Sequence, residues 1–172
     1  MRALPLRALP LRALSLRTLI AIAVLAAPAL AVAAEEPVKP YVQSDSNAGA
    51  VPIKGDAVFQ AFHGKAGVDR VVAATIGRAV KDPRIAEIFQ GHDLERLQRT
   101  LSEQICYLLG GPCRYTGRDM KTVHKDLGDQ ASDLNALVED LQLAMDAEGV
   151  PFRAQNRLLA KLAPMKRAVV TR

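Results

Sequence analysis

The chain has 172 residues, enough for one domain with a substantial core and too few for two. Its apolar fraction is 49%, but aromatic residues make up only 4% and tryptophan is absent, so the core must be aliphatic, which favours packed helices over a β-sandwich. Four arginines and no acidic residue precede residue 35, so the remainder carries 23 − 4 = 19 basic and 18 acidic side chains. This near-neutral balance argues against a nucleic-acid-binding function.

The first 34 residues have the pattern of an export signal. A pentad that begins with arginine occurs three times in residues 2–16 and precedes an apolar run from Leu19 to about Leu30. Residues 29–31 and 31–33 both fit the small-x-small pattern of cleavage sites. Because the apolar run is short for a bilayer span, we expect a cleaved signal peptide and export, to the periplasm in a bacterium. An uncleaved membrane anchor is the alternative.

The domain that follows is predicted to be all-α. Residues 35–55 hold three prolines and many small polar residues, and we expect them to form a flexible tether to a domain of residues 56–172. No segment of this domain alternates as a strand does. The apolar spacing, with Asp93 as a cap and glycines or prolines as ends, predicts helical segments over residues 57–63, 68–80, 85–89, 94–108, 120–127, 132–148 (opening at Ser132 or Asp133) and 151–165.

The chain has two cysteines, Cys106 and Cys113, on either side of a Gly-Gly-Pro turn. In an oxidising compartment this turn could fold Cys113 back onto the end of the helix that contains Cys106, so we expect a disulfide. Two separate thiols, one of them buried, are the alternative. A zinc site is not expected, because no histidine or third cysteine lies at ligand spacing.

His124 is the strongest candidate for a ligand. The sequence has no Gly-rich phosphate loop and no constellation of nucleophile and base, so a hydrolase is not supported. A lone histidine on a short helix is usually structural or exposed, but Met120 and Leu127 place His124 on the apolar face of its helix. An imidazole in an aliphatic cavity needs partners, and a haem iron and a backbone carbonyl would supply them. His63 and His92 are expected at the surface.

The sequence of residues 109–124, LGGPCRYTGRDMKTVH, resembles the signature of the group I truncated haemoglobins. In that family a Gly-Gly-Pro helix end and a Tyr-Thr-Gly loop lead to the proximal histidine. The resemblance extends upstream to residues 82–84 and 88–89 and downstream to residues 148–151, and covers about residues 56–168. It implies the truncated globin fold, a two-over-two sandwich of helices around one haem b.

The resemblance also implies site residues by position. His124 would be the proximal metal ligand, and Phe89 would pack on the porphyrin. Leu97 and Leu101 would face the distal side, and Met120 the proximal side. The other positions expected to contact the cofactor are Ile76, Arg96, Gln104, Ile105 and Tyr115.

Some of these positions depart from the family pattern. Ile76 stands where the family usually has tyrosine, and Leu101 stands where glutamine is frequent. The hydroxyl that commonly holds oxygen is therefore missing, which argues against tight oxygen storage. The polar side chains that could replace it are Gln104, Thr75 and Thr100.

We therefore expect a monomeric or weakly associating, exported haem protein that binds a diatomic gas (oxygen, NO or CO) opposite His124. The alternative is a haem enzyme, such as an NO dioxygenase, that needs an external reductase. The polar-poor pocket favours gas binding, because dioxygenation profits from a stabilised oxygen complex. A haem-free helical interaction domain is the third hypothesis. We expect no nucleic-acid partner, and no membrane contact after cleavage of the signal.

Overall fold

The computed structural model describes residues 35–172, and all regular structure within that range is helical, as predicted. The expected signal peptide lies outside the described residues. No helix in residues 35–172 is long and apolar enough to cross a membrane. The α-helices are α1 Ala57–Ala61, α2 Gly64–Ala79, α3 Leu94–Leu108, α4 Met120–His124, α5 Ala131–Ala147, α6 Phe152–Leu162 and α7 Lys166–Val169; the 3-10 helices are Asp45–Ala48, Ala86–Phe89 and Ala163–Met165.

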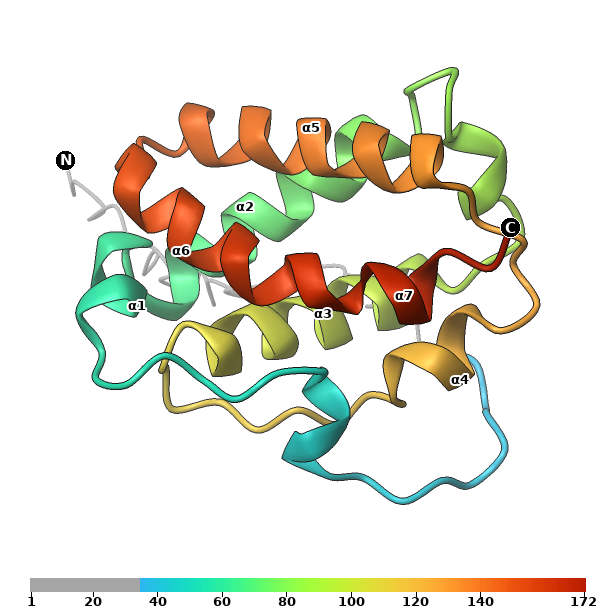
Figure 1. Ribbon diagram of the computed structural model, residues 1–172, viewed down its shortest axis with the longest axis horizontal. Coiled ribbons are helices and arrows are strands. Elements are labelled where there is room, and N and C mark those ends of the chain that lie inside the picture. Colours follow the sequence, from blue (N-terminus) through green and yellow to red (C-terminus); the bar gives the residue numbers. More distant parts are fainter. Residues whose placement is uncertain (1–34) are drawn as a thin grey trace, which may run out of the picture. The chain divides into compact units, whose positions relative to one another are not determined.

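The long helices surround an aliphatic core. Helix α2 packs along α5 on one side and against α3 on the other, and α6 lies across from α3 (Figure 1). Each long helix buries an apolar stripe, since its apolar residues recur every three or four positions. The buried core includes Val68, Val71, Val72 and Ile76 of α2, Ile105 and Cys106 of α3, and Leu141 and Met145 of α5.

Helix α3 begins and ends at the predicted residues. The side chain of Asp93 accepts a hydrogen bond from the backbone N–H of Arg96, which caps the first turn. Gly110 follows the last turn with φ 85°, where a Cβ atom would come within 2.2 Å of the carbonyl oxygen of Gly55. Only glycine fits this conformation and this close approach.

Helix α5 begins slightly earlier than predicted. The cap is Gln130, which forms a capping box with Asp133 at the third helical position. The sequence had suggested Ser132 or Asp133 as the opening residue. Asp133 does stabilise the start of the helix, but as the third residue of its first turn.

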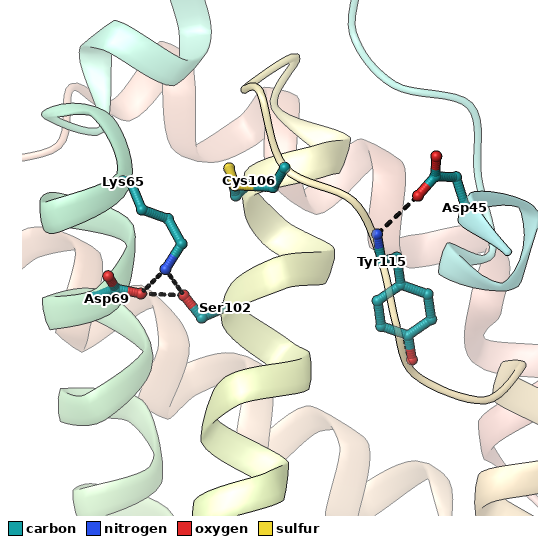
Figure 2. The surroundings of a disulfide bond; sticks show 7 residues. Asp45, Lys65, Asp69, Ser102, Cys106 and Tyr115 are labelled. Carbon is teal, nitrogen blue, oxygen red and sulfur yellow. Dashed lines mark hydrogen bonds and ion pairs between the residues drawn. A yellow bond between two sulfur atoms is a disulfide. The ribbon is translucent and has the colours of Figure 1, made fainter. Parts of the chain in front are cut away.

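The predicted disulfide between Cys106 and Cys113 is present and ties the end of α3 to the following loop. The turn between the two cysteines is tight, because a Cβ atom at Gly111 would lie 2.7 Å from the Cys106 sulfur. Figure 2 shows the disulfide between two hydrogen-bonded groups. On the α2 side, Lys65 donates to Ser102 of α3 over 3.1 Å, and the Asp69 carboxylate accepts hydrogen bonds from both residues.

Residues 35–55 differ from the flexible tether expected from their composition. Ala48 and Ile53 are buried, and the backbone N–H of Ile53 donates to the carbonyl of Leu108 over 2.9 Å. The backbone N–H of Tyr115 donates to the Asp45 carboxylate over 2.8 Å (Figure 2). Isolated apolar side chains and hydrogen bonds to the main chain hold this segment against the domain, and neither produces an apolar period in the sequence.

Candidate functional site

A cavity of about 410 Å³ opens beside α3, α4 and the start of α5, within the size range of cofactor pockets. Most of its lining is apolar, whereas its polar side chains come from the loops, the N-terminal segment, the first half of α3, the end of α4 and the start of α5. The apolar lining residues are Pro37, Val38, Ile85, Ile88, Phe89, Leu97, Val123, Leu127, Leu134, Leu137 and Val169. A hydrophobic ligand with a few polar groups at one edge suits this distribution.

His124 lines this cavity from the end of α4. The helix is started by Asp119, whose side chain accepts a hydrogen bond from the N–H of Thr122 over 3.0 Å. The Nδ1 atom of His124 lies 2.8 Å from the carbonyl oxygen of Met120. Because a carbonyl only accepts, Nδ1 carries a proton, and in the neutral ring the lone pair is then on Nε2. This is the arrangement by which metal-ligating histidines are oriented in proteins.

Five of the predicted site residues meet at the cavity. Phe89 enters from the segment before α3, Leu97 and Arg96 come from the first turns of α3, and Tyr115 from the loop that leads to α4 and His124. The Tyr115 hydroxyl donates to the carbonyl of Arg118 over 2.9 Å, and burial raises the pKa of this phenol.

The other predicted site residues lie away from the cavity surface. Ile76 and Ile105 are buried in the main core, and Leu101 packs against that core from α3. Gln104 is buried farther along α3, where its amide donates to the carbonyl of Ala48 over 2.9 Å and lies 3.3 Å from the Met120 sulfur. Gln104 is therefore not the replacement donor that the sequence suggested.

The threonines proposed as replacement donors are already hydrogen-bonded. Thr75 is buried and donates to the carbonyl of Val71 over 2.8 Å. Thr100 lines the cavity, but its hydroxyl donates to the carbonyl of Arg96 over 2.9 Å. In each case a backbone carbonyl one helical turn earlier accepts the hydrogen bond of the hydroxyl. The cavity therefore offers a bound ligand no uncommitted hydroxyl from these two residues.

His92 and Asp129 are among the polar cavity residues that were not predicted. His92 lines the cavity, although its place before the Asp93 cap suggested a position outside; Gly91, with φ 74°, turns the chain at this point. Asp129 is buried at the cavity, and its Oδ1 has no hydrogen-bond partner among residues 35–172. Burial raises the pKa of Asp129, and the nearby His124 and His92 oppose that shift. The only sequence signal for Asp129 was the Gly128 turn just before it.

The family model described as Bacterial-like globin matches residues 57–171. The chain belongs to this globin family. The globin is 28% identical over 115 residues to the group 1 truncated hemoglobin GlbN of Mycolicibacterium paratuberculosis, covering 67% of this chain and 85% of the relative. It is also 28% identical over 115 residues to GlbN of Nostoc sp., covering 67% of this chain and 98% of the relative.

Solved structures support the same fold. The truncated hemoglobin of Tetrahymena pyriformis in its Fe(III) form matches with a TM-score of 0.64 at 20% identity, covering 67% of this globin and 98% of that chain. The 2/2 hemoglobin of Synechococcus sp. PCC 7002, described in the cyanomet state with covalently attached heme, matches with a TM-score of 0.62 at 23% identity, with coverage of 67% and 98%. The predicted two-over-two truncated globin fold is confirmed.

Proposed function

We propose that this globin binds one haem b in the cavity, with His124 Nε2 as the axial ligand of the iron, and that it binds a diatomic gas there. The observation that carries the proposal is the hydrogen bond from His124 Nδ1 to the Met120 carbonyl, which directs the lone pair of the imidazole to Nε2 at an apolar cavity. Membership of the globin family and the names of its truncated hemoglobin relatives support it.

The residues around the cavity fit such a cofactor. Phe89 and Leu97 supply apolar surface for a porphyrin ring, and Val123 extends that surface beside His124. Arg96 and Arg118, also in the lining, place positive charge where carboxylates of the ring would meet solvent. Bound haem would supply an iron with a coordination position for oxygen, NO or CO.

Reversible gas binding is favoured over NO dioxygenation. The hydroxyls of Thr100, Tyr115 and Tyr41, which line the cavity, each donate to a backbone carbonyl. A dioxygenase profits from donors that stabilise bound oxygen, and these three are committed elsewhere. A redox role with an external reductase is therefore the second candidate.

Titration of the purified apoprotein with hemin tests the proposal. We expect the Soret band to saturate at one haem per chain, and the reduced protein to give a CO difference spectrum that reverses when CO is removed. If no Soret band develops, the haem-free helical interaction domain becomes the better hypothesis. NO-dependent consumption of oxygen at catalytic rates with a reductase present would support the enzyme instead.

We further propose that the protein is exported and works as a monomer or weak oligomer. The cationic and apolar leader supports export, and so does the disulfide between Cys106 and Cys113, since disulfides persist in oxidising compartments. The mass of the protein recovered from a periplasmic extract should correspond to cleavage after Ala31 or Ala33. Recovery of the uncleaved chain from the membrane fraction would contradict export as a free protein.

A further inference from the structure

One wall of the cavity is built by residues that precede the globin match. Residues 35–41, here called the strap, contribute Glu36, Pro37, Val38 and Tyr41 to the lining. In Figure 1 the strap is the blue stretch at the start of the coloured ribbon. The family match begins only at residue 57, so the globin core alone would leave this side of the cavity without these four residues.

The first end of the strap is fixed to the start of α3. The Glu35 carboxylate accepts hydrogen bonds from Arg99, one of them over 2.8 Å, and lies 3.4 Å from the Arg96 guanidinium. The backbone N–H of Glu36 donates to the Asp93 carboxylate over 2.7 Å, and Arg96 donates to the Glu36 carbonyl. Charge-assisted bonds of this kind are among the stronger hydrogen bonds in proteins.

The second end is fixed to the loop before α4. The Tyr41 hydroxyl donates to the carbonyl of Thr116 over 2.6 Å. The Arg118 guanidinium lies over the Tyr41 ring, 5.1 Å from its centre, and donates to the carbonyl of Lys39 over 3.2 Å. These contacts hold both the ring and the backbone of the strap at this point.

The two anchors lie on α3 and on the loop before α4, which are themselves joined, because Arg99 donates to the Thr116 hydroxyl over 2.6 Å. Helix α3 presents Leu97, and the loop of residues 115–118 leads into α4 and His124. We propose that the strap is part of the haem site itself: it spans the edge of the cavity between α3 and the loop before α4 and slows the escape of the cofactor. This inference rests on the proposed function, because the ligand retained is the haem.

The test is the rate at which the holoprotein loses haem to an excess of an apoglobin acceptor, followed at the Soret band. Glu35→Gln weakens the first anchor, and Tyr41→Ala removes the bond to Thr116 and the Arg118 contact of the second anchor together with part of the wall. We expect each variant to lose haem about three to ten times faster than the wild type, a change of about 0.7–1.4 kcal/mol. The double variant should lose haem faster than either single one.

The matched control is Glu148→Gln. Glu148 accepts hydrogen bonds from Arg70 and His63 at the other end of α5, and none of these residues lines the cavity. This control should lower the melting temperature of the apoprotein and leave haem loss within about twofold of the wild type. If haem loss merely follows the melting temperature across all variants, the strap acts through general stability and the inference is wrong.

The two proposals fail in different ways. A wild type without a Soret band contradicts haem binding and the strap together. A normal Soret band with strap variants that release haem at the wild-type rate contradicts only the strap.

Discussion

Replacing Leu97 by glutamine should slow the release of oxygen. Leu97 lines the cavity from α3 and offers no hydrogen-bond donor, and the hydroxyl of Thr100, on the same helix, is bonded to the main chain. Bound oxygen draws negative charge, and a hydrogen bond to a charged group contributes about 1.5–3 kcal/mol. The glutamine amide should therefore slow oxygen dissociation by about 10-fold to 150-fold. CO, which draws little charge, should dissociate at nearly the wild-type rate.

The assay is stopped-flow replacement of oxygen by CO, with Leu97→Met as the control. Methionine matches glutamine in length and supplies no donor, so it should leave the oxygen rate close to that of the wild type. Equal slowing by both substitutions would show that volume, and not a hydrogen bond, controls release. Slow release in the wild type, lost in His92→Leu, would show that His92 already supplies the donor and would refute the reasoning.

Three further predictions concern stability, each measured by urea unfolding. Replacing Cys106 and Cys113 together by serine should lower the free energy of unfolding by about 2.5 kcal/mol, the loop-closure value for residues seven apart. If the reduced wild type is more stable than this variant by over 1 kcal/mol, loop closure is not the cause. Asp140 is buried with Oδ2 unpartnered among residues 35–172, and burial raises its pKa, so the contribution of Asp140 to stability falls as pH rises above about 3.8. Asp140→Asn should therefore add about 1 kcal/mol at pH 7 and little near pH 3; a loss at pH 7 would contradict this. Hydrogen bonds from Arg70, and to a smaller extent from His63, lower the pKa of Glu148 to about 2. Glu148→Gln should therefore lower the free energy of unfolding at pH 7, and the difference from the wild type should vanish as pH falls from about 4.5 to 2. A difference in stability that does not depend on pH would exclude the charge as its source.

The parts of the fold set by local signals could be predicted from the sequence. Asp93 and Gly110 bound α3 because a capping side chain and a left-handed glycine act on their own neighbours. The start of α5 was displaced because its cap is Gln130, which is not one of the preferred capping residues.

The candidate site could be predicted only where one face of a short helix decides the position. Met120 and Leu127 placed His124 on the cavity side, and the structure puts it there. Ile76 and Ile105 were expected at the cofactor because of the family resemblance by position, and in this chain both are buried in the main core. The strap was missed because its contacts join residues about 60 to 80 positions apart and leave no periodic pattern.

The most direct test of the central claim compares His124→Ala with His92→Ala in hemin titrations, each with and without added imidazole. Both histidines line the cavity, but only His124 has its Nδ1 bonded to the backbone carbonyl one turn earlier. We predict that His124→Ala loses the Soret band or gains a spectrum that imidazole converts toward that of the wild type, whereas His92→Ala keeps the wild-type spectrum. An unaltered Soret band in His124→Ala together with its loss in His92→Ala would contradict the assignment.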